Sequence, residues 1–105
     1  MTKPNTRVES MLRELSSVLA RLGEDECFEV LYTLLTPPER AKIALRWKLV
    51  CMLEQGITQR AIASELGISL CKITRGSHEL KFGPESFRKV IRKAVATGIA
   101  RRLKR

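Results

Sequence analysis

The stretch QRAIASELGISLCKITRGSH, residues 59–78, limits the possible folds more than any other part of the chain. Ala63 is small at a point where two helices would cross closely, and Gly67 can adopt the positive φ of a tight turn. Apolar side chains occupy the positions where these helices would pack together: Ile62, Leu66, Ile68 and Ile73. The pattern predicts a helix-turn-helix. A plain helical hairpin would explain the apolar positions, but not the basic, hydroxyl-rich outer face of the second helix.

Helical spacing continues on both sides of this stretch. Apolar residues at positions 8, 11, 12, 15, 18, 19 and 22 form one stripe, which predicts an amphipathic helix closed by Gly23. Thr36, Pro37 and Glu39 form the capping signals of a third helix that stops at Gly56. The predicted helices cover about 8–22, 25–35, 37–54, 59–66, Ser69 to the Gly83-Pro84 pair, and 85–103. No strand is predicted, so the fold class is all-α.

Length and composition fit one small helical domain. The chain has 105 residues and few aromatic side chains, so its core must consist mostly of Leu, Ile, Val and Ala, and dimerisation would complete that core. We predict a single domain over residues 1–105. Its parts are dimerisation helices over about 7–54, a helix-turn-helix over about 58–80, and a C-terminal helix over about 85–103.

The charge is distributed unevenly along the chain. Residues 1–40 carry a net charge of −2 and residues 41–105 carry +11, which together make the +9 of the whole chain. A basic region of this kind is typical of proteins that bind a polyanion such as nucleic acid. The alternative is that the charge serves solubility alone.

Cysteine and histidine usage disfavours a metal site or an enzyme. Cys27, Cys51 and Cys71 show no CxxC spacing, and His78 is the single histidine, so no metal site is predicted. No nucleophile–base set and no carboxylate pair in the basic half is visible, so no catalytic residue is predicted. The apolar runs are too short for a signal core or a membrane span. We expect a cytoplasmic protein that does not contact a membrane.

In a helix-turn-helix the second helix enters the major groove of DNA. The candidate DNA contacts lie on the outer face of that helix and at the start of the first: Gln59, Arg60, Ser69, Leu70, Cys71, Lys72, Thr74, Ser77 and Lys81. Among the residues facing the bases only Lys72 is a long donor. Phosphate contacts, water and DNA shape would therefore supply much of the specificity.

Four segments make the sequence resemble the tryptophan repressor family. They are LTPPER (35–40), LRWKLV (45–50), TQRAIASELGIS (58–69) and, most specifically, ITRGSHELK (73–81). The resemblance covers about residues 33–92. It implies an intertwined six-helix homodimer with a helix-turn-helix, whose core is built from both chains.

The resemblance also implies a slot for L-tryptophan between the third helix and the recognition helix. Arg46 and Arg75 match the two arginines that sandwich the indole ring, and Arg75 also matches the residue that holds the carboxylate. Gly76 matches the glycine against which the ring lies. Val50 matches the floor of the slot. Two positions match the contribution of the partner chain: Leu35 and Thr36.

The chemistry of these residues agrees with a slot for an aromatic amino acid. A guanidinium group is flat, stacks on aromatic rings and pairs with carboxylates through two hydrogen bonds. Gly76 costs a helix roughly 1 kcal/mol relative to alanine but lets a ligand approach the backbone. Arg75 can equally be a phosphate contact and Arg46 a solvated arginine, so only the combination favours a ligand. Trp47 is assigned to core or dimer-interface packing.

Two residues depart from the family pattern, which has small side chains where this sequence has Lys72 and Glu79. One hypothesis is that Glu79 accepts the ammonium group of the ligand. The other is that Glu79 forms an i, i+4 ion pair with Arg75 and occupies it. The chain also has one residue fewer between the third helix and Thr58 than the family pattern, which would shift the recognition helix slightly.

These observations lead to a specific functional hypothesis. We expect a ligand-gated transcriptional repressor that binds a palindromic DNA operator as a homodimer, with L-tryptophan or a close indole analogue as co-repressor and no other cofactor. The main alternative is a constitutive helix-turn-helix DNA-binding protein without a small-molecule ligand. A third possibility is an architectural protein that coats nucleic acid through basic residues near its end: Arg101, Arg102, Lys104 and Arg105.

Overall fold

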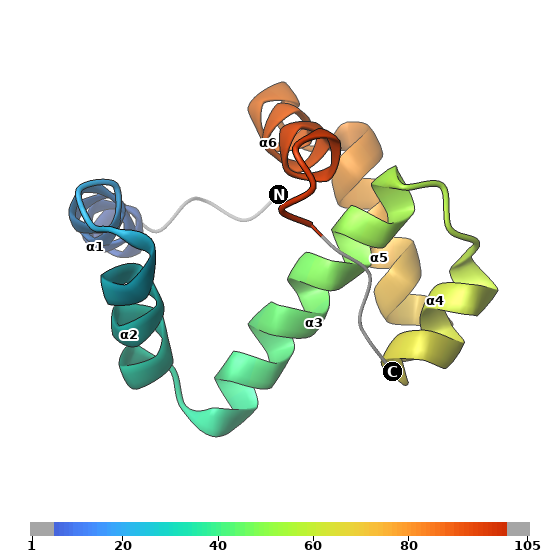
Figure 1. Cartoon of the computed structure of the whole chain (residues 1–105), viewed down its shortest axis with the longest axis horizontal. Coiled ribbons are helices and arrows are strands. Elements are labelled where there is room, and N and C mark those ends of the chain that lie inside the picture. The colour runs from blue at the N-terminus through green and yellow to red at the C-terminus, as the bar shows by residue number, and fades with distance from the viewer. Residues whose placement is uncertain (1–5, 101–105) are drawn as a thin grey trace. The chain divides into compact units, whose positions relative to one another are not determined.

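The structure, a computed structural model, describes residues 6–100. Within that range it contains helices and no strand, which confirms the all-α prediction (Figure 1). The helices are α1 (Thr6–Leu19), α2 (Glu24–Leu34), α3 (Pro37–Glu54), α4 (Gln59–Leu66), α5 (Leu70–Phe82) and α6 (Glu85–Ala96). Internal contacts divide the chain into two compact units, Met1–Pro38 and Glu39–Arg105. The single-domain organisation and the intertwined homodimer both stay predictions.

The first unit contains α1 and α2, and none of its described residues is buried. Its large apolar side chains are exposed, and they include Val8, Met11, Leu12, Val18, Phe28, Leu31, Tyr32 and Leu34. The prediction that Gly23 closes the first helix is wrong. α1 ends at Leu19, and Gly23 has a φ of −75° and precedes α2 as its N-cap, because the chain turns at residues 20–22.

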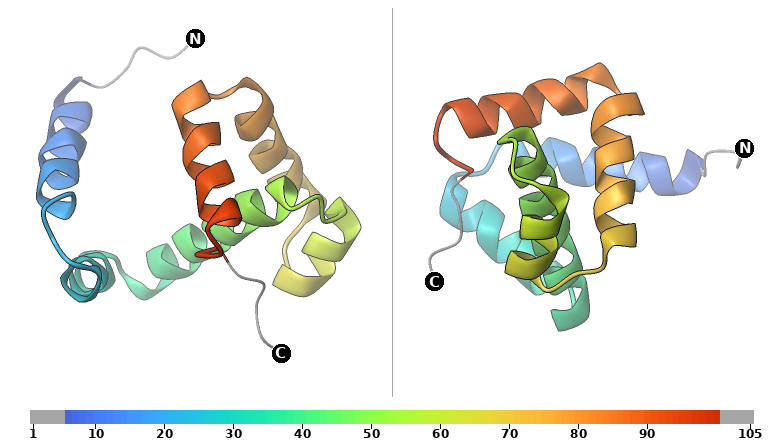
Figure 2. Two further views of the ribbon diagram at one scale, coloured as in Figure 1. Left: turned by 45° about the horizontal axis from the view of Figure 1, so that its top comes forward. Right: turned by 90° about the vertical axis from the view of Figure 1, so that its right-hand side faces the viewer.

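The second unit has its core around the C-terminal half of α3, which α4, α5 and α6 surround in both views of Figure 2. Leu49 and Met52 pack with Ile62 of α4 and Ile73 of α5. A second cluster joins α3 to α5, α6 and the segment after α6: Val50, Cys51, Leu80, Ile91 and Ala100. The apolar positions identified in the sequence therefore meet as a core that one chain supplies by itself.

The first half of α3 has no buried residue. The helix begins at Pro37, as predicted, because the fixed φ of proline suits the first helical position. Trp47 remains 37% exposed. Its own chain therefore does not bury it in a core, and its assignment to a dimer interface stays a prediction.

The prediction that the last helix runs to about residue 103 is wrong. α6 ends at Ala96, and Gly98 then adopts a left-handed φ of +79°, which helices do not continue through. The Thr97 hydroxyl donates to the carbonyl of Lys93 at 2.8 Å, and Ala100 folds back into the core. The last three predicted positions, 101–103, lie outside the described residues.

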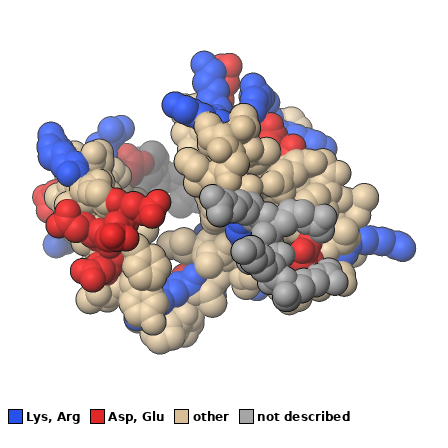
Figure 3. Space-filling view, viewed as in Figure 1, with Lys and Arg blue, Asp and Glu red and all other residues tan. Residues whose placement is uncertain are grey.

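Charge follows the two units. Figure 3 shows acidic side chains gathered over α1 and α2 and basic side chains over α6. The first turn of α2 supplies Glu24, Asp25 and Glu26, whereas α6 carries Arg88, Lys89, Arg92 and Lys93. The basic region predicted from the sequence thus coincides with the unit that holds the helix-turn-helix.

Candidate ligand pocket and nucleic-acid interface

The helix-turn-helix is held by local hydrogen bonds at its caps. The Thr58 hydroxyl accepts from the Ala61 N–H at 3.2 Å and starts α4. Gly67 ends α4 with a φ of +65°, a conformation that only glycine adopts without cost, and its N–H donates to the Ala63 carbonyl at 2.9 Å. Ser69 then caps α5 by accepting from the N–H of Lys72 at 3.4 Å. The predicted bounds of α4 and the role of Gly67 are confirmed.

The outer face of α5 is open to solvent. Leu70 is 51% exposed, and the other predicted DNA contacts that are exposed are Gln59, Arg60, Ser69, Cys71, Lys72, Thr74 and Lys81. Ser77 is half-buried. Two of these hydroxyl groups already form hydrogen bonds within their own helix. The Ser69 hydroxyl caps α5, and the Thr74 hydroxyl donates to the Leu70 carbonyl at 2.9 Å. Their oxygens are therefore less free to contact DNA than the sequence suggested.

A pocket of about 560 Å³ lies between α3, α5 and α6. It is lined by twelve residues: Ala41, Lys42, Leu45, Arg46, Leu49, Val50, Ile68, Lys72, Arg75, Gly76, Glu79 and Phe87. This volume falls within the roughly 300–1,000 Å³ of small-molecule sites. Five residues named in the sequence as ligand contacts meet in it: Arg46, Val50, Arg75, Gly76 and Glu79.

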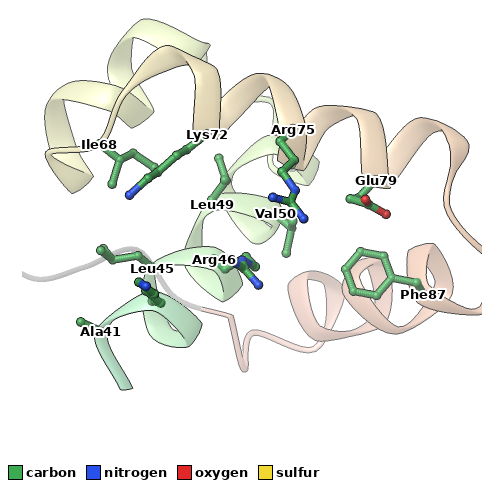
Figure 4. A pocket seen from close by; sticks show the side chains of 12 residues that line it. Ala41, Leu45, Arg46, Leu49, Val50, Ile68, Lys72, Arg75, Glu79 and Phe87 are labelled. Carbon is green, nitrogen blue, oxygen red and sulfur yellow. The ribbon is translucent and has the colours of Figure 1, made fainter. Parts of the chain in front are cut away.

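The two arginines face the pocket from opposite helices. In Figure 4 the side chain of Arg75 extends from α5 toward Val50 and Arg46 of α3. Both arginines are exposed, and neither guanidinium group makes a hydrogen bond or an ion pair with a residue in the range 6–100. Two flat cations are therefore available to a ligand that enters between them.

Gly76 has a packing role that the sequence did not reveal. It is buried, and a Cβ placed on it would lie 2.8 Å from Cδ2 and 3.0 Å from Cγ of Leu49. The glycine therefore lets α5 approach α3 closely. Its role as bare backbone for a ligand stays a prediction alongside this packing role.

Glu79 and Lys72 occupy opposite ends of the pocket (Figure 4). Lys72 was assigned to DNA from the sequence, yet it lines the pocket together with Ile68. Among residues 6–100, Arg75 and Glu79 form no ion pair with each other, so the occupied-arginine hypothesis receives no support from the structure.

Several residues that line the pocket were not predicted from the sequence to do so. Lys42 lies four positions before Arg46 and Lys72 three before Arg75, so helical spacing alone places each on the face of its arginine. Phe87 belongs to a different helix, and no spacing in the sequence connects it to α3. Leu35 and Thr36, which match the partner chain's contribution in the family, belong to the first compact unit and do not line the pocket.

The cysteines and acids form no further site in the part of the chain that is described. Cys27, Cys51 and Cys71 are free thiols, and no cluster of His, Cys, Asp or Glu suited to a metal ion occurs within residues 6–100. Burial raises the pKa of the Cys51 thiol above its usual value, which the nearby Lys48 partly offsets. Over the same residues, no helix has both the length and the apolar character needed to cross a membrane.

The fold and the exposed recognition helix define a helical protein of the helix-turn-helix class. A family model described as Trp repressor protein matches residues 6–95, and the chain belongs to this family. Members of the family are DNA-binding transcription regulators and not enzymes.

Relatives named Trp operon repressor homolog occur in several bacteria. The protein of Chlamydia trachomatis serovar L2 is 30% identical over 89 residues, which cover 83% of this chain and 95% of that protein. The Vibrio atlanticus protein is 35% identical over 81 residues, covering 75% and 83%. The Vibrio cholerae serotype O1 protein is 45% identical over 71 residues, covering 66% and 69%. No solved structure matched the chain significantly.

Proposed function

We propose that this protein is a homodimeric transcriptional repressor that binds a palindromic DNA operator when L-tryptophan occupies the pocket between α3 and α5. The observation that carries the proposal is the pair of guanidinium groups of Arg46 and Arg75. They make no ion pair or hydrogen bond with residues 6–100, and they face one pocket directly behind the recognition helix.

The chemistry of the pocket suits an aromatic amino acid. The indole ring stacks between the planar groups of Arg46 and Arg75, and Arg75 pairs with the carboxylate. Val50 and the backbone of Gly76 contact the ring, since both line the pocket. The ligand is then held by charge, stacking and apolar contact together, which is the usual combination in small-molecule sites.

Dimerisation is part of the proposal because α1 and α2 leave apolar surface uncovered. Phe28 is 63% exposed and Leu34 is 60% exposed, and none of the described residues of this unit, 6–38, is buried. Large apolar side chains that are left exposed in this number are typical of a surface that another chain covers. A second copy would cover it and would bring Leu35 and Thr36 of the partner chain to each pocket.

The dimer presents two copies of α5 to successive major grooves, about 34 Å apart. The basic side chains of the second unit neutralise phosphates, and Leu70, Cys71 and Thr74 lie on the face that meets the bases. The ligand lies between α3 and α5, so it sets the angle at which α5 leaves the core. A coupling of roughly 1–3 kcal/mol between ligand and DNA is enough for a switch. A regulator of this kind works in the cytoplasm, where bacterial DNA is found.

The test is a selection of binding sites from a library of random DNA duplexes, with and without added L-tryptophan. We expect palindromic sites with half-sites about one helical turn apart to be enriched only when L-tryptophan is present. Enrichment of the same sites without the ligand would support the constitutive alternative. Binding without any sequence preference but with a steep salt dependence would support the architectural alternative.

A further inference from the structure

One end of the pocket combines apolar side chains with two lysines. Figure 4 shows Lys72 and Ile68 at this end. Ala41 and Leu45 of α3 lie below them in the same view. Lys42 directly follows Ala41 and also lines the pocket, so a second ammonium group belongs to this end. Ile68 and Leu45 are half-buried and both lysines are exposed, so the end offers an apolar wall beside two accessible cations.

The charge of these lysines is not balanced within the pocket. Among the twelve described residues that line it, four are cationic and one, Glu79, is acidic. Lys42 lies four positions before Arg46 on α3, and such a spacing puts two like charges on one helix face. Lys72 lies three positions before Arg75 on α5, with the same result. Like charges that are neighbours on a helix repel each other. An excess of positive charge in a cleft attracts an anion from outside the chain.

The rest of the described chain does not supply that anion. Neither Lys42 nor Lys72 forms a hydrogen bond or an ion pair through its side chain with a residue in the range 6–100. An ordinary aromatic amino acid does not supply it either, because its carboxylate and its ammonium group cancel. A ligand with one more acidic group would reduce the excess of positive charge, and the position of that group follows from the way the ligand enters.

The proposed function orients the ligand along the pocket. Its ring lies between Arg46 and Arg75, and its carboxylate pairs with Arg75. The ammonium group is attracted toward Glu79, the acidic residue of the lining. Glu79 and Lys72 occupy opposite ends of the pocket, so the far edge of the ring points toward Lys72 (Figure 4).

We propose that Lys42 and Lys72 form an anion subsite, so that an acidic group at the far edge of the ring strengthens ligand binding. The aliphatic stems of the two lysines and the side chain of Ile68 contact the ring, and the ammonium groups donate charge-assisted hydrogen bonds to the acidic group. An uncharged group of the same shape receives weaker hydrogen bonds. This inference rests on the proposed function, because it requires an aromatic amino acid between Arg46 and Arg75.

The test is calorimetric titration of the full-length protein, without DNA, with 4-carboxy-L-phenylalanine and 4-carbamoyl-L-phenylalanine. The two ligands have nearly the same shape and differ by one negative charge on the ring substituent. We expect the wild-type protein to bind the acid at least roughly tenfold more tightly than the amide. Lys42→Gln and Lys72→Gln should each lower this preference by roughly three- to tenfold, and the double variant should abolish it. The affinity for the amide should stay within about threefold in all three variants.

Lys89→Gln is the matched control, since it removes the same charge from an exposed position on α6 that does not line the pocket. It should leave the preference for the acid unchanged. A preference that persists in the double variant would show that the net positive charge of the whole protein causes it, and the subsite would be overturned. The subsite would also be overturned if the lysine variants weakened only the binding of a DNA duplex, because the lysines would then serve phosphate groups.

Titration of the wild-type protein with L-tryptophan separates this inference from the proposed function. If L-tryptophan binds but the acid and the amide bind equally, the subsite is overturned while the proposed function survives. If the acid binds through the two lysines and L-tryptophan does not bind, the subsite is supported and L-tryptophan is overturned as the co-repressor. If none of the three ligands binds, both proposals are overturned.

Discussion

The two compact units of this chain bury their apolar residues in different ways. Among the described residues, the second unit buries nine hydrophobic side chains, from Leu49 to Ala100, whereas the first unit buries none. Both units have amphipathic helices, so the difference is not one of sequence pattern. It shows that the helix-turn-helix half is supported by its own core, while α1 and α2 require an apolar surface from outside the unit.

The largest effect that separates the two units should come from a charge placed on the apolar stripe of α1. Leu12 is 56% exposed in the single chain, and we propose that a second copy covers it. Leu12→Asp loses that burial twice in a symmetric dimer, about 1.5–3 kcal/mol each time, so the dissociation constant of the dimer should rise roughly 10²–10⁴-fold. Sedimentation equilibrium measures it directly.

Ser10→Asp is the control for that variant, because position 10 lies off the apolar stripe of the same helix. It should leave the dimer intact. A fully dimeric Leu12→Asp protein would mean that α1 is not part of the interface. Dimerisation would then not explain why the apolar side chains of α1 are exposed.

The core of the second unit can be tested with one substitution made at two sites. Ile73 of α5 is fully buried against α3 and α4, whereas Ile99 is 74% exposed. Ile73→Ala should lower the free energy of unfolding by about 2–5 kcal/mol because it removes buried contacts and leaves a cavity. Ile99→Ala should change it by less than about 0.5 kcal/mol. Urea unfolding of both variants measures the difference, and equal losses would show that the core is not where the structure places it.

A smaller effect should come from the close approach of α5 to α3 at Gly76. Gly76→Ala gains about 1 kcal/mol of helix propensity but forces Leu49 to move, at a cost of about 1–3 kcal/mol. We expect a net loss of up to about 2 kcal/mol in the free energy of unfolding. Adding Leu49→Ala should remove the conflict, so that the double variant is more stable than the sum of the two single changes predicts. Strict additivity would contradict this packing.

The smallest effect should come from the ion pair between α3 and α6. Arg92 Nε lies 3.4 Å from Glu54 Oε1, and the two side chains are 66% and 30% exposed. Water and salt screen such a pair, so Arg92→Ala should change the free energy of unfolding by no more than about 0.5 kcal/mol. A loss above about 1.5 kcal/mol in urea unfolding would mean that α6 is attached to the core less firmly than its buried Ile91 indicates.

Much of the fold could be predicted because its signals are local. Thr58, Gly67 and Ser69 form their caps with residues three or four positions away, so sequence spacing alone located α4 and the start of α5. The end of α6 was missed because the basic residues after Gly98 have helical composition. There the left-handed φ of Gly98 and the burial of Ala100 determine the chain's path.

The candidate site could be predicted only in part. Arg46, Val50, Arg75 and Gly76 were named because the resemblance covers them, and they do line one pocket. The packing of Gly76 against Leu49 and the placement of Phe87 beside Glu79 depend on the distance between helices. The residue pattern within one helix does not determine how far that helix lies from its neighbours. The division of the chain into two units was also absent from the sequence, since apolar stripes look the same whether they are covered by one chain or by two.

The central claim is that a planar amino acid binds between Arg46 and Arg75. Calorimetric titration of the wild-type protein with L-tryptophan tests it most directly, beside Arg46→Ala, Arg75→Ala and, as a control outside the pocket, Arg92→Ala. We expect one ligand bound per chain, an affinity loss above tenfold in each of the first two variants, and no change in the control. Absence of binding to the wild-type protein, or equal binding by all four proteins, would contradict the claim.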